Sequence, residues 1–321
     1  MVIDFQHHYV PVELAKKRGL YSEKMTYLQE NGRRATTLHE RLYNLDLQLE
    51  DMTAAGINIS VLSCLLGWTA SLDECRLIND DLAAIQLKHR GSFVGLAQTP
   101  VFGGTAAMNE IDRAIRELKL KGITITSQVE GVSLDSERLY PLYEKACELD
   151  VPIFVHPALA PIGYELLQDY DLPRVLGREV DLLVATTRVI AGGVLDRFPG
   201  LKLVLAHFGG GVAAVKDRLL NKSYRFGSLK RSFGDYFDLL YFDLAGFEGA
   251  LPALKCALEG IRPDRLVFAS DYPQDFSGVN TDTGRGMKEL KEYIDAVQAL
   301  PLSEKTKTDI LGGTAKRLLK I

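Results

Sequence analysis

Residues 136–156, SERLYPLYEKACELDVPIFVH, hold one complete unit of the pattern that decides the fold of this chain. Ser136 occupies the position of a helix N-cap, and an apolar helix face begins at Leu139. Val151–Val155 then forms a short apolar run without polar alternation, which is typical of a strand buried on both faces of a parallel sheet. His156 stands directly after that run. The segment therefore predicts a helix followed by a buried strand that ends in a histidine.

The same alternation of helical patterns and short apolar runs extends along all 321 residues. Eight runs indicate strands: Val2–Phe5, Ile57–Ser63, Phe93–Ala97, Gly122–Ile125, Val151–Val155, Leu203–Ala206, Leu239–Leu244 and Leu266–Ala269. The helical patterns between them include Leu72–Lys88, Thr105–Leu118 (with Thr105 as N-cap), Ser136–Leu149, Asp181–Arg197 and Leu251–Leu258. Eight units of about 40 residues each are a normal size for a (β/α)8 barrel, so we predict an α/β fold of the TIM-barrel type.

A doubly wound open sheet is the alternative fold. That fold usually carries a glycine-rich phosphate-binding turn after its first strand, and no such turn follows Phe5. No linker rich in proline, glycine or serine interrupts the alternation. We therefore predict one barrel domain over residues 1–321.

Composition excludes several classes of function. A net charge of -4 and an isoelectric point near 5.9 argue against nucleic acid or an anionic membrane as the main partner. No stretch approaches the roughly 18 unbroken apolar residues that a spanning helix needs, and the first residues lack the features of a signal peptide. The four cysteines lie far apart and form no CxxC pair, which indicates free thiols in a reducing cytoplasm.

Three of the six histidines stand at the ends of predicted strands. His8 follows the first strand, His156 the fifth, and His207 (in LVLAHFGGG) the sixth, while Asp271 (in LVFASDYP) follows the eighth. Because the carboxyl ends of the strands meet at one mouth of a barrel, we expect these four side chains to converge there. Imidazole nitrogens and a carboxylate are the donors of catalytic zinc and manganese sites, so the pattern predicts a metal centre.

Two segments are longer than a minimal barrel requires. Val10–Leu47 follows the first strand, and Pro157–Glu179 follows the fifth strand and carries Arg174 and Arg178. Since both segments follow strands, we expect both at the mouth where barrel enzymes keep their active sites.

These motifs resemble the amidohydrolase superfamily, in the branch that contains aminocarboxymuconate-semialdehyde decarboxylase and γ-resorcylate decarboxylase. The resemblance runs nearly end to end, through IDFQHHYVP, DMTAAGI, RLINDDLA, SFVGLAQTP, LYPLYEKACELDVPIFVHP, RFPGLKLVLAHFGGG and RLVFASDYP. It implies one divalent metal ion, zinc first and manganese second, held by His8, His156 and Asp271. It also implies a catalytic role for His207.

Gln6 departs from the family pattern, whose first motif has a histidine or glutamate at this position. Strand alternation places Gln6 on the same face as His8, with His7 on the other face. A glutamine can offer its amide oxygen to the metal, but it is a weaker ligand. The departure leaves three readings: a weaker fourth ligand, a site of three residues, or a chain that has lost its metal.

The resemblance implies non-oxidative decarboxylation of a small aromatic or unsaturated carboxylic acid. The metal would act as a Lewis acid on the substrate carboxylate, while His207 and Asp271 would move the proton that replaces carbon dioxide. Arg174 and Arg178 would grip a substrate carboxylate through paired hydrogen bonds, or else remain solvated loop charges. The resemblance also implies a homodimer.

Two other functions stay open at this stage. A metal-dependent hydrolase or hydratase, acting on a lactone or an unsaturated diacid, would use the same barrel and the same ligands. A barrel that has lost its metal would instead be a binding protein, and Gln6 is the single residue that favours this reading.

Overall fold

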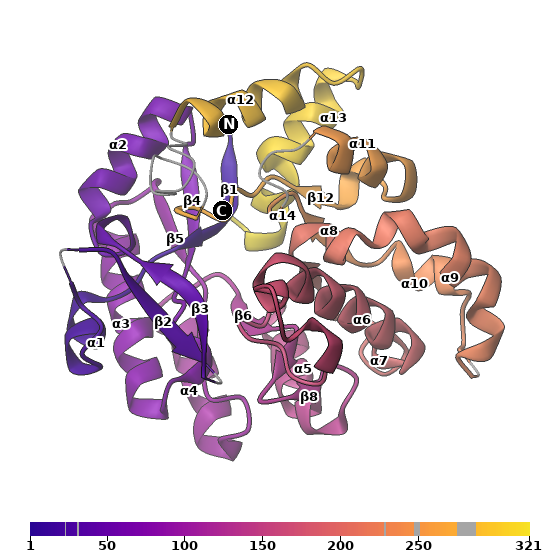
Figure 1. The fold of residues 1–321 in the computed structure, drawn as a ribbon, viewed down its shortest axis with the longest axis horizontal. Coiled ribbons are helices and arrows are strands. Elements are labelled where there is room, and N and C mark those ends of the chain that lie inside the picture. Colours follow the sequence, from indigo (N-terminus) through magenta and orange to yellow (C-terminus); the bar gives the residue numbers. More distant parts are fainter. Residues whose placement is uncertain (23, 31, 228, 247–250, 275–286) are drawn as a thin grey trace.

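The computed structural model of this chain describes residues 1–22, 24–30, 32–227, 229–246, 251–274 and 287–321 (Figure 1). Within these residues the short apolar runs form the strands of a central barrel, and most of their side chains are fully buried. The barrel strands are β1 (Ile3–His8), β4 (Ile59–Ser63), β5 (Phe93–Gly95), β6 (Ile123–Thr126), β9 (Ile153–His156), β10 (Leu203–Leu205), β11 (Tyr241–Asp243) and β12 (Leu266–Val267).

All these strands are parallel, and two bridges close them into a ring. Hydrogen bonds connect them in the orders β1-β4-β5 and β12-β11-β10-β9-β6. A parallel bridge between Ala97 and Ile123 joins the β5 side to β6, and another between His7 and Tyr272 joins β1 to the segment after β12. The prediction of a (β/α)8 barrel is confirmed.

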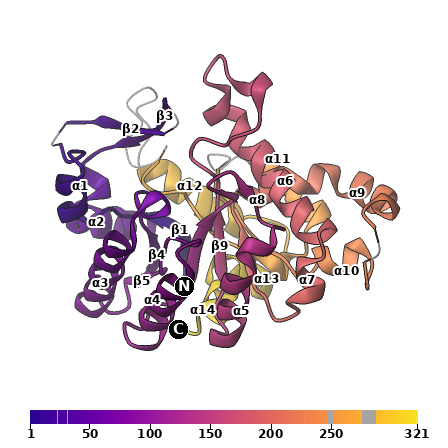
Figure 2. The same cartoon turned by 90° about the horizontal axis from the view of Figure 1, so that it is seen from below.

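Helices surround the barrel (Figure 2), and the longer ones pack apolar residues against it. They are α2 (Leu45–Ala55), α3 (Leu72–Lys88), α4 (Gly104–Arg116), α5 (Tyr140–Leu149), α6 (Arg178–Ala191), α7 (Val194–Arg197), α8 (His207–Gly211), α9 (Lys216–Lys222), α10 (Phe233–Phe237), α11 (Leu251–Gly260), α12 (Met287–Gln298), α13 (Glu304–Thr308) and α14 (Thr314–Leu319). No described helix is both long and apolar enough to cross a bilayer.

Three helix boundaries differ from the sequence-based expectation. Ser136 caps a 3-10 turn that leads into α5, so it acts as a cap one turn before the α-helix. The prediction for Thr105 was wrong: α4 starts at Gly104, whose positive φ of 63° turns the chain into the helix one residue earlier. The helix expected over 181–197 divides into α6 and α7, because Gly193 adopts a φ of 72°.

The two long segments have structure of their own. The first contains α1 (Val12–Lys17) and an antiparallel hairpin of β2 (Thr26–Glu30) and β3 (Arg33–Leu38). The second carries short helical turns at Glu165–Leu167 and Pro173–Gly177. Figure 2 shows the hairpin and the second segment standing at the same end of the barrel, as expected for segments that follow parallel strands.

Candidate metal centre and active site

Strand β1 supplies two inward-facing side chains, Gln6 and His8, which are both fully buried. The Nδ1 atom of His8 lies 3.1 Å from the Ser63 hydroxyl at the end of β4. The intervening His7 points elsewhere: its Nδ1 atom pairs with Asp4 at 3.0 Å, and its ring stacks on Tyr272. The strand therefore sends alternate side chains to the site and to the packing around it.

His156 ends strand β9 with one ring nitrogen engaged and the other free. Its Nδ1 atom lies 2.7 Å from the Pro157 carbonyl oxygen, to which it donates, so the lone pair belongs to Nε2. Burial lowers the pKa of His156 to about 3, which keeps the ring neutral. Nε2 is buried and has no described hydrogen-bond partner. A buried, neutral nitrogen with an unused lone pair is suited to bind a metal ion.

Asp271 follows β12 in the left-handed region, with a φ of 60°. Its position is fixed by the neighbouring Ser270, whose backbone N–H and hydroxyl both donate to Asp4 of β1, at 2.9 and 2.5 Å. The Oδ1 atom of Asp271 lies 2.8 Å from Nε2 of His8 and 3.9 Å from Nε2 of His156. Residues from the two ends of the chain therefore meet at this carboxylate.

The donor atoms of His8, His156 and Asp271 all lie within 4.8 Å of one another. Two imidazole nitrogens and one carboxylate oxygen are a common ligand set of divalent zinc and manganese, and they leave coordination positions open. The unpartnered Nε2 of His156 is the observation that a bound cation would explain. These three residues fit a single divalent metal ion.

Gln6 lies beside this set. Its Nε2 atom donates to Oδ1 of Asp271 at 2.5 Å, and its Oε1 atom is buried without a described partner. The amide therefore contacts the proposed ligand Asp271 and keeps its oxygen free. Whether that oxygen binds the metal stays a prediction.

His207 stands at the end of β10 in strained backbone, with a φ of 52° that Phe208 and three glycines continue. Its backbone N–H donates to Asp243 at 2.7 Å, and its Nδ1 atom pairs with Glu179 at 2.7 Å. Burial alone would lower the pKa of His207, but the negative charge of Glu179 raises it to about 9. Nε2 lies 3.5 Å from Nε2 of Gln6, so this edge of the ring faces the side of the proposed metal site where Gln6 lies.

Two glycines allow the close approach of these groups. A Cβ atom on Gly210 would meet the Glu179 carbonyl oxygen at 2.1 Å, so a glycine here lets α6 bring Glu179 to His207. A Cβ atom on Gly246 would meet the His207 ring at 2.1 Å. Both glycines have a positive φ.

The two arginines have partners within the protein. Arg174 donates to Asp171 at 2.9 Å on the loop after β9. Arg178 is half-buried and donates to two backbone carbonyls, those of Leu159 (3.1 Å) and Ala35. The structure thus shows Arg178 joining the β2–β3 hairpin to the loop after β9, and a contact of either arginine with substrate stays a prediction.

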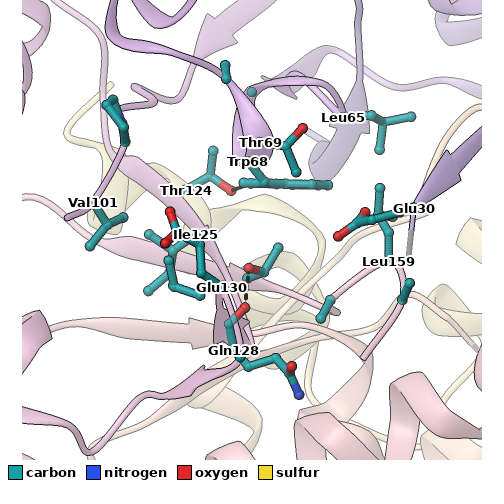
Figure 3. Close-up of a pocket in the computed structure, with 18 of the residues that line it drawn as sticks. Glu30, Leu65, Trp68, Thr69, Val101, Thr124, Ile125, Gln128, Glu130 and Leu159 are labelled. Carbon is teal, nitrogen blue, oxygen red and sulfur yellow. Dashed lines mark hydrogen bonds between the residues drawn. The ribbon is translucent and has the colours of Figure 1, made fainter. Parts of the chain in front are cut away.

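Sequence reasoning missed two neighbours of the site. The sequence pointed to Glu179 only through its acidic side chain and its position in the long segment after the fifth strand. Trp68, the single tryptophan of the chain, stacks on His156 with ring centroids 4.2 Å apart and presents its edge to His8. Beside Trp68 lies a pocket of about 350 Å³ (Figure 3).

Comparison with known proteins agrees with this geometry. The pattern of the amidohydrolase family matches residues 3–321, nearly the whole chain. The chain belongs to the amidohydrolase family. This amidohydrolase is 30% identical over 262 residues to the decarboxylase orsB of Emericella nidulans. The aligned region covers 77% of each chain.

Further relatives identify the branch. The 2-amino-3-carboxymuconate-6-semialdehyde decarboxylase of Dictyostelium discoideum is 26% identical and covers 90% of this amidohydrolase and 80% of the relative. The γ-resorcylate decarboxylase of Rhodococcus jostii is also 26% identical, with 86% and 88% covered. A solved 5-carboxyvanillate decarboxylase of Novosphingobium aromaticivorans, in complex with manganese, aligns with a TM-score of 0.80 at 25% identity and covers 100% and 96% of the two chains. The expected superfamily branch is confirmed.

Proposed function

We propose that this amidohydrolase is a metal-dependent non-oxidative decarboxylase of a small aromatic or unsaturated carboxylic acid. One observation carries the proposal: His207, paired with Glu179, turns its Nε2 edge toward the cluster of His8, His156 and Asp271. A proton donor thus stands beside a site for a Lewis acid. The decarboxylases among the relatives support the same reaction.

The reaction can be written from these groups. A divalent metal ion held by His8, His156 and Asp271 would supply Lewis acidity at the substrate carboxylate. The bond between the substrate carbon and its carboxylate breaks, carbon dioxide leaves, and the electron pair stays on the carbon. His207 gives its Nε2 proton to that carbon. Before this transfer, Glu179 accepts a hydrogen bond from Nδ1 of His207 and stabilises the positively charged ring.

The second proposed proton carrier is Asp271. Burial would raise the pKa of this carboxyl, but the imidazoles of His156 and His8, 3.9 and 2.8 Å away, and the charge of His207 hold it well below its usual range. Asp271 is therefore ionised near neutral pH. It serves first as a ligand, and His207 is the better proton donor.

The identity of the metal and the surroundings of the protein also belong to the proposal. We propose zinc or manganese as the ion, since two imidazoles and a carboxylate accept both. We further propose one domain over residues 1–321, a homodimer, a small carboxylate as the only substrate partner, and a cytoplasmic location, which the free cysteines favour.

A hydratase is the second candidate function, because a 2-keto-4-carboxy-3-hexenedioate hydratase of Sphingobium is 23% identical over 99% of this chain. Released carbon dioxide separates the two functions. Metal-loaded protein incubated with hydroxybenzoates and unsaturated acids should release carbon dioxide stoichiometrically with loss of the acid. Uptake of water into the acid with no gas release would favour the hydratase.

His207→Asn tests the proposed proton donor. We expect a loss of at least about 10²-fold in turnover, the low end of the contribution of a positioned acid–base group, with metal content unchanged. Turnover like that of wild type in a folded, metal-loaded variant would remove His207 from the reaction.

A further inference from the structure

The pocket beside Trp68 has the size and walls of a site for an aromatic ring. Its volume is about 350 Å³, within the usual range for small-molecule sites. Apolar side chains line it, among them Leu65, Trp68, Val101, Ile125, Leu159 and Ile162. Figure 3 shows the Trp68 ring extending across the pocket, with the Thr124 hydroxyl at one end.

Two lining residues of this pocket lie next to the proposed metal ligand His156. Trp68 lines the pocket and stacks on the proposed ligand His156. Thr126, another lining residue, pairs in register with His156 across β6 and β9. A molecule whose carboxylate reaches His8, His156 and Asp271 can therefore extend its remaining atoms along Trp68.

The charge of the pocket is negative. Glu30, from the end of β2, and Glu130, from the turn after β7 (Gln128–Val129), both line it, and no lysine, arginine or histidine is among the described lining residues. Figure 3 shows the Glu30 carboxylate directed into the pocket. Glu130 is exposed at the rim, so solvent screens it more than Glu30.

The neutral polar groups of the pocket already have partners. The hydroxyl of Thr124 accepts from the Trp68 indole N–H at 3.3 Å, that of Thr126 donates to the Gln128 carbonyl oxygen at 2.6 Å, and that of Thr99 donates to a backbone carbonyl. Glu30 is half-buried, and burial raises its pKa although the charge of Arg178 opposes this. A ligand hydroxyl would give this carboxyl a donor that water otherwise supplies.

Resting on the proposed function, we propose that this pocket selects aromatic acids with one carboxylate. The remainder of the ring carries neutral hydroxyl and apolar groups, with a hydroxyl donating to Glu30 and the ring lying along Trp68. A second carboxylate on the ring would meet Glu30 in a partly desolvated space. Like charges placed together at a binding site cost affinity and exclude the wrong ligand.

The experiment measures binding, because the substrate is not identified. Metal-loaded protein is titrated calorimetrically with 2,4-dihydroxybenzoate, which has one carboxylate, and with 2-hydroxybenzene-1,4-dicarboxylate, which has a second carboxylate in place of the 4-hydroxyl group. Wild type should bind the monocarboxylate at least about 10-fold more tightly, since a like-charge contact in a partly desolvated space costs affinity, although the charge of Arg178 offsets part of the charge of Glu30. Glu30→Gln should reduce this preference, Glu130→Gln should reduce it less, and the exposed Glu165→Gln should leave it unchanged.

The outcomes separate this inference from the proposed function. Tighter binding of the dicarboxylate by wild type, no binding of either acid, or an unchanged preference in Glu30→Gln would overturn the inference. Carbon dioxide release from the dicarboxylate at the same efficiency would also overturn it, while leaving the decarboxylase proposal intact. If neither acid releases carbon dioxide but the preference and its loss in Glu30→Gln are observed, the pocket inference holds and the decarboxylase proposal fails.

Discussion

At the scale of single residues, His207 is held from three directions. Asp243 accepts from its backbone N–H, Glu179 pairs with its Nδ1 atom, and Gly246 lies against its ring. Nε2 is the ring nitrogen that Glu179 does not engage, so it is the one that can transfer a proton. It faces Gln6 and the proposed ligands. Because these contacts fix both the position and the charge of the ring, the function of His207 depends on residues that do not touch the substrate.

Glu179 should be a positioning residue whose effect appears in the pH profile. Since its charge raises the pKa of His207 to about 9, Glu179→Gln should lower that pKa by about 1–3 units. The charged, proton-donating form of His207 is present below its pKa and is lost above it. The alkaline limb of kcat/KM should therefore move to lower pH in the variant. Glu165→Gln, an exposed change on the same loop, is the control, and coincident alkaline limbs in all three proteins would refute the assignment.

We predict that Gln6 affects how tightly the metal is held. Its free Oε1 lies in a buried site with a proposed ligand beside it. Gln6→Glu adds a charge attracted to the cation and should tighten metal binding, whereas Gln6→Ala should weaken binding without unfolding the barrel. Metal dissociation constants for the three proteins test this. If neither change moves the constant beyond error, the ion is held by three residues and Gln6 is a hydrogen-bonding neighbour only.

At the scale of elements, the strands could be predicted more reliably than the contacts of the loops. Apolar runs between helical patterns located the barrel strands, and histidines at strand ends located the mouth, because the parallel topology makes strand ends converge. The pairing of Glu179 with His207 could not be predicted, since it depends on how close α6 approaches Gly210, and that is a property of packing. The roles of Arg178 and Trp68 were missed for the same reason: their partners are distant in sequence and include backbone carbonyls.

Arg178 and Arg174 should differ in what their loss disturbs. Arg178 joins the β2–β3 hairpin to the loop after β9 through two carbonyls, and hydrogen bonds from a charged group are worth about 1.5–3 kcal/mol each. Arg178→Met should therefore destabilise the protein and speed amide exchange in β2 and β3. Arg174 makes a partly exposed ion pair with Asp171, worth about 1 kcal/mol or less.

The variants Arg174→Met and Arg178→Met also test the role in substrate binding that the sequence predicts for Arg174. If Arg174 grips the substrate carboxylate, Arg174→Met raises KM for the acid and leaves metal content unchanged. Unchanged exchange of the hairpin in Arg178→Met would show that the contact between hairpin and loop does not depend on this guanidinium.

At the scale of the whole molecule, the metal should connect the ends of the barrel. His8 lies in β1, His156 in β9 and Asp271 in the segment after β12. One ion would therefore join the first strand of the barrel, a strand from the middle of the sequence and the segment after the last strand. An ion that binds the folded state alone stabilises it by about 2.7 kcal/mol at a free concentration 100 times Kd. Removal by a chelator should therefore lower Tm by several degrees, and added zinc or manganese should restore it.

His156→Ala should show a Tm near that of the metal-free protein and no response to chelator, because the variant lacks one of the three proposed metal ligands. His89→Ala, at the C-terminal end of α3, should respond to chelator as wild type does. If chelator leaves the Tm of wild type unchanged although metal is removed, the ion has no part in holding the ends together. Closure of the barrel would then depend on the protein's own contacts between β1 and the segment after β12, which include the His7–Tyr272 bridge and the hydrogen bonds from Ser270 to Asp4.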